Sequence, residues 1–261
     1  MPEIFDASKF LEETMKKLLL LLSILFLTPS ITLAEGNTFN DSFNKAKRIL
    51  QDEVYYDHQV TLYCGYEYDD QKRICLPDGF IAEKHQKRSY KIEWEHSVPA
   101  ENFGRAFTEW REGHPLCVDN KGKSFKGRKC AEKVNKTYRY MQSDMYNLFP
   151  AVGSVNAARS NKQYSELLGV QSAFGTCEAK IDGNRFEPPD RAKGQVARAA
   201  LYMDKEYKEY NLSRQQRRLF EAWSNMYPVD EWECTRAKRI ESIQGNENIF
   251  VKNMCIEKGL W

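Results

Sequence analysis

The feature that most constrains what this chain can fold into is a short apolar run near its N-terminus. Residues 18–27 are apolar apart from one serine, follow Lys16 and Lys17, and lead to small residues ending at Ala34. A basic start, a short apolar core and small residues before a cut are typical of a secretory signal peptide. Ten residues are too few for a stable membrane span. We therefore expect cleavage after Ala34 and an exported chain, with a retained N-terminal anchor as the alternative.

This leader defines the expected division of the chain. The signal peptide is predicted over residues 15–34, and residues 1–14 fit no leader pattern, so we interpret them as a misassigned upstream extension. Without residues 1–34 the chain keeps 36 Lys and Arg against 33 Asp and Glu, a net charge of +3. No repeat or linker divides residues 35–261. One mixed domain is therefore expected over that range.

All seven cysteines follow the expected cut. An exported protein meets an oxidising compartment, so disulfides are the default interpretation. Cys117 and Cys130 bracket a polar loop rich in Gly and Lys, and Cys234 and Cys255 could hold the C-terminal segment. Three further cysteines cannot be paired from the residues alone: Cys64, Cys75 and Cys177. A zinc site is a weak alternative, because the sequence has no Cys-x-x-Cys pair and no Cys–His cluster.

Hydrophobic spacing predicts an α+β fold with several helices and short antiparallel strands. With 41% hydrophobic residues the chain can form a core, which excludes wholesale disorder. Helices are predicted near residues 40–53, over residues 197–207 and from an N-cap at Ser213, and short strands near Val60 and Trp94. The helix after Ser213 is expected to bury a face formed by Leu219, Ala222, Trp223 and Met226.

The segment Glu-Trp-Glu-His at residues 93–96 carries the first chemical signal. If a strand ends at His96, the side chains of Glu95 and His96 can converge on one small volume. A carboxylate suits Mg²⁺, and an imidazole can take a proton from an attacking water. The common alternative is a Glu–His pair that is merely solvated on a surface strand.

Two later segments add possible partners. Asn147 offers an amide oxygen that can bind Mg²⁺ without adding charge; the alternative is a turn or capping asparagine before a proline. Arg128 lies in the loop that a Cys117–Cys130 disulfide would close, where a guanidinium can clamp a phosphate. A basic surface loop is the alternative interpretation of that segment.

The stretch from residue 105 to residue 139 is strongly basic. It holds ten Lys and Arg against four Asp and Glu, a local balance of +6. Such a stretch binds backbone phosphates without reading bases; the alternative is a solvated loop. The lysines that we expect to contact nucleic acid are Lys121, Lys123, Lys126 and Lys129.

Taken together, these segments resemble the bacterial endonuclease I family of periplasmic and secreted nucleases, which carry a ββα-metal (His-Me finger) site. The matching segments run in order along essentially the whole predicted mature chain, so residues 35–261 are expected to form one endonuclease I-like nuclease domain. Besides those above, the matching residues include Val155, Asn156, Arg159, Asn161 and the Pro-Pro-Asp-Arg-Ala run at 188–192.

The resemblance implies a role for each site residue. His96 stands where the family has its general base, and Glu95 and Asn147 stand where it has the protein ligands of a single Mg²⁺, for which Mn²⁺ can substitute. Arg128 stands where an arginine steadies the cleaved phosphate. The implied activity is cleavage of DNA, and in many family members also of RNA, to 5′-phosphate products without sequence preference. The resemblance implies a periplasmic or secreted monomer with no membrane segment after signal cleavage.

The chain departs from the family pattern at one cysteine. Many relatives have Cys-Gly-Cys where this chain has Cys64-Gly65-Tyr66, so a disulfide common in the family is expected to be absent. Cys75 is then expected to be unpaired, and Cys64 is expected to bond Cys177.

Two other functions remain open at this stage. A non-catalytic exported nucleic-acid-binding protein would keep the basic surface, but Glu95, His96 and Asn147 are all present, which favours an enzyme. An exported hydrolase could instead act on another phosphodiester or on the cell wall. The basic loop and the lack of an isolated carboxylate pair disfavour the cell-wall substrate.

Overall fold

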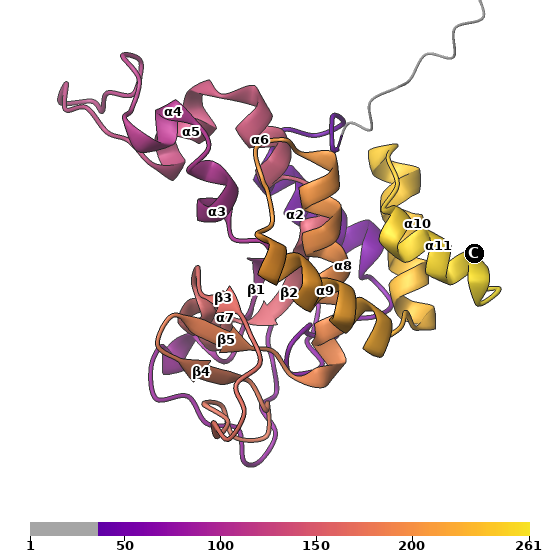
Figure 1. Cartoon of the computed structure of the whole chain (residues 1–261). Helices are drawn as coiled ribbons and strands as arrows, with labels where there is room; N and C mark the ends of the chain where they lie inside the picture. The colour runs from indigo at the N-terminus through magenta and orange to yellow at the C-terminus, as the bar shows by residue number, and fades with distance from the viewer. Residues whose placement is uncertain (1–35) are drawn as a thin grey trace, which may run out of the picture. The chain divides into compact units, whose positions relative to one another are not determined.

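The computed structural model describes residues 36–261; the predicted upstream extension (1–14) and signal peptide (15–34) lie outside the described residues. The described part forms a single α+β domain, as predicted (Figure 1). Its elements in chain order are α2 (Phe43–Ile49), η1 (Leu50–Val54), η2 (Gln86–Arg88), β1 (Ile92–His96), α3 (Ala100–Gly104), α4 (Thr108–Arg111), α5 (Arg128–Val134), α6 (Lys136–Gln142), η3 (Met145–Asn147), β2 (Leu148–Val152), α7 (Gly153–Arg159), β3 (Gln163–Tyr164), β4 (Lys180–Asp182), β5 (Arg185–Glu187), α8 (Asp190–Glu206), α9 (Arg214–Met226), α10 (Glu231–Gln244) and α11 (Ile249–Glu257).

A strand–strand–helix unit forms the part of the fold that positions the site. β1 and β2 pair antiparallel, with Ile92 opposite Val152 and His96 opposite Leu148. α7 begins directly after β2 at Gly153. A Cβ at this glycine would lie 2.5 Å from the carbonyl oxygen of Arg88, so only glycine allows the helix to start so close to η2. A second sheet, of three short strands, has the strand order β3-β5-β4.

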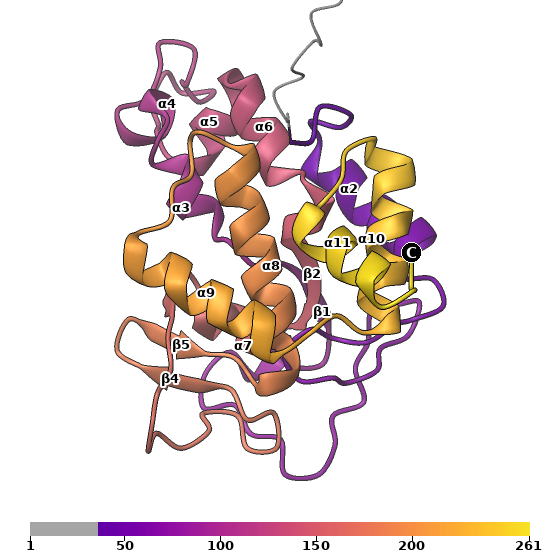
Figure 2. The ribbon, with the colours of Figure 1, turned by 45° about the vertical axis from the view of Figure 1, so that its right-hand side comes forward.

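α8 is a largely buried helix that lies among several others. It packs against α9, α11 and η3, and Figure 2 shows α9 crossing near one end of it, with α10 and α11 at its side. Its buried residues include four alanines and one glycine, which let neighbouring backbones approach closely. At Gly194 a Cβ would lie 2.1 Å from the carbonyl oxygen of Tyr227, so the approach there requires glycine.

The helix predictions hold, with one correction to a buried face. The helix expected near residues 40–53 is α2 continued by η1, and Ser213 caps α9 by accepting a hydrogen bond from the backbone N–H of Gln216. The face of α9 is shifted, however: it buries Phe220, Trp223 and Ser224, whereas Ala222 is exposed and Met226 is 68% exposed. The observed buried face is displaced by one residue from the predicted face, which corresponds to a rotation of about 100° around the helix axis. This rotation places Met226 on the solvent side.

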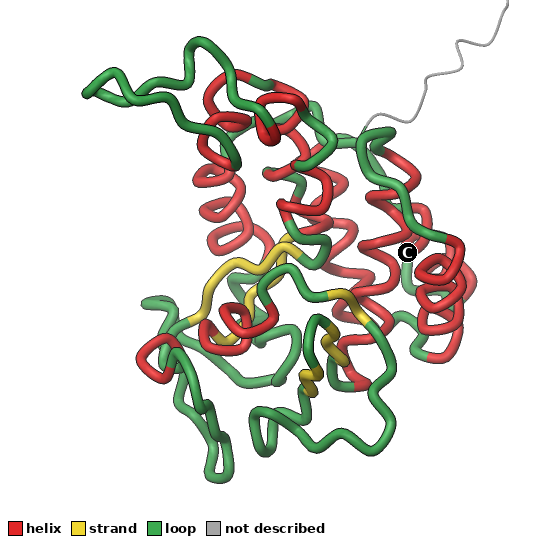
Figure 3. The backbone as a smooth tube through the Cα atoms, turned by 60° about the vertical axis from the view of Figure 1, so that its left-hand side comes forward, coloured by secondary structure: helices red, strands yellow, loops and turns green. Residues whose placement is uncertain are grey.

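The strand predicted near Val60 is wrong, whereas the one containing Trp94 is β1. Val60 forms only an isolated bridge with Glu67. The backbone N–H of Leu62 donates to the carbonyl oxygen of Pro150, at 2.8 Å. The segment thus meets its hydrogen-bonding needs through scattered partners, and Figure 3 shows how much of the chain runs as loop beside the short strands.

The three predicted disulfides are confirmed. They join Cys64 to Cys177, Cys117 to Cys130 and Cys234 to Cys255. Cys75 is unpaired and exposed, as expected. The Cys117–Cys130 bond closes the base of a loop that projects from the helices beside it (Figure 3) and ties it to the first turn of α5.

A buried ion pair joins α8 to α10 and carries a stability prediction. Arg198 donates from Nε and Nη2 to the two carboxylate oxygens of Glu233, at 2.7 and 2.6 Å, with both side chains at most 5% exposed. Glu233→Ala would leave a buried guanidinium without its counter-charge, which typically costs about 3–5 kcal/mol. Glu231→Ala, at an exposed position of the same helix, is the control. The free energy of unfolding is measured by urea titration. Equal values for Glu233→Ala, Glu231→Ala and the parent would contradict this expectation.

Candidate active site

His96 is the last residue of β1 and is nearly buried. Its Nε2 lies 2.8 Å from the backbone carbonyl oxygen of Gln142. A carbonyl can only accept, so Nε2 carries the proton and Nδ1 is left unprotonated. Nδ1 makes no hydrogen bond within residues 36–261. Burial lowers the pKa of His96 to about 3, and the nearby Arg128 charge acts in the same direction, so the ring is neutral and offers Nδ1 as a base.

Glu95 precedes His96, and only one of its two carboxylate oxygens accepts hydrogen bonds within residues 36–261. Its Oε1 accepts hydrogen bonds from Arg159 Nη1 and from the hydroxyl of Tyr63, each at 3.0 Å. Oε2 accepts none within the described part of the chain. Burial raises the pKa of Glu95 to about 7, although the Arg159 guanidinium opposes the rise. A cation at Oε2 would favour the ionised carboxylate.

Both residues line a cavity of about 310 Å³, which Asn156 of α7 also lines. The side-chain nitrogen of Asn156 donates to Glu93 Oε2 at 2.8 Å. Because a carboxylate accepts but cannot donate, this bond fixes which way the amide faces. It leaves Asn156 Oδ1 without a hydrogen bond among residues 36–261. The cavity therefore combines an open carboxylate oxygen, an open amide oxygen and an open imidazole nitrogen.

Asn147 lies elsewhere, although it is close in sequence to β2. It ends η3 and is fully buried. Its Oδ1 accepts from the backbone N–H of Val98 at 2.6 Å, and its Nδ2 donates to the carbonyl oxygen of Val98 at 3.0 Å. Both amide atoms are thus used by one peptide segment, and Asn147 does not line the cavity. The structure gives it the position of a turn asparagine rather than bringing its oxygen to Glu95 and His96.

Arg128 does reach the cavity, from the first residue of α5. It is exposed, and its guanidinium carbon lies 5.2 Å from the centre of the Phe43 ring. The same ring packs against His96, with centroids 4.9 Å apart. Arg128 makes no ion pair within residues 36–261, so its guanidinium can bind an anion. The lysines predicted to contact nucleic acid are exposed on the loop before α5 and on its first turn, outside the cavity: Lys121, Lys123, Lys126 and Lys129.

Arg159 has a central position that the sequence did not reveal. It ends α7, is 1% exposed, and donates from Nη1 to Glu95 Oε1 and to the carbonyl oxygen of His96. Its Nη2 donates to the carbonyl oxygen of Ser97. One guanidinium therefore fixes the end of β1 and the carboxylate together. The available signal was the family resemblance, which includes Arg159 and Asn156 among the matching residues.

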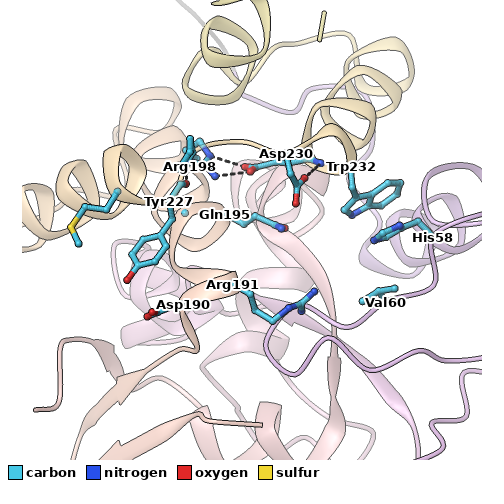
Figure 4. A pocket seen from close by; sticks show the side chains of 13 residues that line it. His58, Val60, Asp190, Arg191, Gln195, Arg198, Tyr227, Asp230 and Trp232 are labelled. Atoms are coloured by element: carbon cyan, nitrogen blue, oxygen red, sulfur yellow. Dashed lines mark hydrogen bonds and ion pairs between the residues drawn. The ribbon is translucent and has the colours of Figure 1, made fainter. Parts of the chain in front are cut away.

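A different cavity, of about 610 Å³, lies along the N-terminal half of α8 (Figure 4). Its two arginines are already engaged: Arg198 with Glu233, and Arg191 with backbone carbonyl oxygens. His58 stacks on Trp232, with ring centres 4.0 Å apart. No arginine of this cavity is free to bind an anion, whereas Arg128 at the His96 cavity makes no ion pair among residues 36–261, so we place the chemistry at His96.

The described chain contains no cluster of three or more His, Cys, Asp or Glu side chains that could hold a metal. A cation at the His96 cavity would therefore rely on one carboxylate, an amide oxygen and water. Mg²⁺ suits such a set, because it prefers oxygen ligands and keeps several waters. No helix within residues 36–261 has the length and apolarity needed to cross a membrane.

The fold and this cavity define the class of protein: a disulfide-bonded hydrolase built on a strand–strand–helix unit. Comparison with known families is specific, since the model of the endonuclease I family matches residues 35–255. The chain belongs to the endonuclease I family and is an endonuclease, a hydrolase of phosphodiester bonds.

Individual relatives match along most of their length. An extracellular deoxyribonuclease of Aeromonas hydrophila is 40% identical, over 82% of this chain and 90% of its own. A periplasmic deoxyribonuclease of the same species is 38% identical, over 90% of this chain and 93% of its own. Endonuclease-1 of Buchnera aphidicola subsp. Acyrthosiphon pisum is 37% identical, over 84% of this chain and 83% of its own.

Proposed function

We propose that this protein is an exported, Mg²⁺-dependent deoxyribonuclease that cleaves DNA without sequence preference and leaves 5′-phosphates. The observation that carries the proposal is one cavity lined by His96, Glu95, Asn156 and Arg128. The deoxyribonuclease names of its Aeromonas relatives support DNA as the substrate. Cleavage of RNA stays a prediction.

The metal would be held by Glu95 Oε2 and Asn156 Oδ1. These two oxygens fit a cation because they line one cavity and have no hydrogen-bond partner among residues 36–261. We propose Asn156 in place of Asn147, whose amide is occupied by Val98. Bound there, Mg²⁺ would neutralise charge on the phosphate and on the departing 3′-oxygen.

The protein side chains would then have separate tasks. His96 Nδ1 accepts the proton of the attacking water while the Gln142 carbonyl oxygen keeps the ring oriented. Arg128 binds the phosphate as negative charge builds on it. Arg159 and Tyr63 act as positioning residues, because they hold Glu95 through its other oxygen.

An exported location and a monomeric state complete the proposal. The three disulfides fit an oxidising compartment. The relatives named extracellular and periplasmic deoxyribonuclease support the same location.

Metal removal tests the proposal. The oxidised mature protein is incubated with supercoiled plasmid, and in parallel with RNA, in Mg²⁺ or in excess EDTA. We expect nicking and degradation of plasmid in Mg²⁺, none in EDTA, and recovery when Mg²⁺ is restored, followed by gel electrophoresis. Full activity in EDTA would contradict the metal site. Binding of plasmid without nicking in Mg²⁺ would instead favour the non-catalytic nucleic-acid-binding protein.

A further inference from the structure

A cavity of about 630 Å³ adjoins the candidate active site. It is distinct from the cavity along α8, and we call it the second cavity. Ser160 lines both cavities. The residues just before Ser160 line different cavities: Asn156 lines the His96 cavity, whereas Ala157 and Ala158 line the second cavity. The end of α7 is thus a shared wall, and a chain-like ligand leaving the His96 cavity across Ser160 would enter the second one.

The second cavity has positive groups at its rim and an apolar wall. Lys84 and Lys162 line it, and neither ammonium makes an ion pair or hydrogen bond within residues 36–261; Glu83 supplies one negative charge. The exposed imidazole of His85 can stack against a base. The apolar part of the lining is Ala157, Ala158, Ala173, Phe174 and Ile181.

Two residues of this lining have a left-handed backbone although neither is glycine. The φ angle is 59° at His85 and 51° at Ser160. Such conformations cost free energy and persist where the surrounding structure holds them, most often at functional sites. Here they place an imidazole and a hydroxyl-bearing residue at the same cavity.

We propose that this second cavity is a subsite for the nucleic-acid strand. It binds a nucleotide that lies further along the strand than the cleaved bond. Lys84 and Lys162 contact its backbone phosphates, and His85 stacks on its base. The cavity is within the 300–1,000 Å³ range typical of ligand sites. This inference rests on the proposed function, because the strand enters from the His96 cavity.

Substrate length separates a subsite from a general loss of activity. The variant Lys84→Gln with Lys162→Gln is compared with Lys208→Gln and Lys238→Gln, two exposed lysines outside both cavities. Steady-state cleavage is measured on single-stranded oligonucleotides, from the shortest that the parent cleaves up to twenty nucleotides. For the double variant we expect KM on the longest strand to rise about tenfold with kcat unchanged, and the salt dependence to weaken by a slope of about 1.4.

The shortest cleaved oligonucleotide provides the internal control. On it the double variant and the parent should agree within about twofold, because a short strand does not reach the second cavity. An unchanged KM on the longest strand, or an equal loss at every length, would overturn the subsite while leaving the nuclease intact. If the parent also fails to nick plasmid in Mg²⁺, the proposed function itself fails; if it nicks plasmid but cleaves no oligonucleotide at any length, only the subsite is overturned. His85→Ala is expected to raise KM on the longest strand alone.

Discussion

His96→Ala is expected to lower kcat for plasmid cleavage by at least about 100-fold, the usual contribution of a general base. The reason is that His96 brings a neutral, correctly oriented imidazole to the cavity, with Nε2 tied to the Gln142 carbonyl oxygen and Nδ1 open. Initial rates of conversion from supercoiled to nicked plasmid measure the effect at saturating Mg²⁺. Because the variant also leaves the Gln142 carbonyl oxygen without this partner, its folding is checked beside its rate.

His58→Ala is the matched control for that experiment. His58 is partly buried and, like His96, lies beside an aromatic ring, but it belongs to the cavity along α8. Its replacement should change the cleavage rate by less than about threefold, since no reacting group is removed. The general-base assignment fails if His96→Ala keeps a rate within that same range while circular dichroism shows both variants folded.

Asn156→Ala is expected to lower the affinity for Mg²⁺, whereas Asn147→Ala is expected to lower the stability of the fold. Removing Asn156 takes away an oxygen proposed to hold the cation, so affinity for Mg²⁺ should fall by at least the roughly 10–100-fold that even an outer partner contributes. Its thermal unfolding should stay close to that of the parent, because Asn156 makes one side-chain hydrogen bond, to Glu93.

Asn147→Ala should instead act on stability. It would leave the backbone N–H and carbonyl of Val98 without their side-chain partner, at a cost of about 1–3 kcal/mol for a buried unpaired group. Magnesium titration of cleavage rates and urea unfolding are measured on both variants. A metal defect in Asn147→Ala together with an unfolding defect in Asn156→Ala would reverse our assignment of the two asparagines.

The sequence was most informative where a local pattern has one structural solution. The Ser213 cap, the strand ending at His96 and the Cys117–Cys130 and Cys234–Cys255 pairs were predictable, because capping, alternation and an oxidising compartment each restrict the outcome. The Cys64–Cys177 pair was expected only from the family resemblance. The shifted face of α9 was not, because which stripe is buried depends on how the helix docks on α8.

The two asparagines show why the site itself was harder. Asn147 and Asn156 have the same side chain and lie on either side of β2, so residue type cannot tell them apart. What separates them is tertiary: the Val98 peptide occupies one amide, and the Glu93 carboxylate turns the other outward. The position of Arg159 against the end of β1 is likewise set by where α7 packs, which no local pattern specifies.

The contacts of α10 have a consequence for how the enzyme is made. Arg236 reaches back to the carbonyl oxygens of Met145 and Leu148 at 2.7 and 2.9 Å, and Gln244 accepts from the backbone N–H of Met145. The turn before β2 is therefore secured by residues synthesised some ninety positions later, with separations of 88–99 residues. A growing polypeptide therefore cannot secure the turn that leads into β2 until residue 244 has been added, so the strand–strand–helix unit is fully supported only when most of the chain is present.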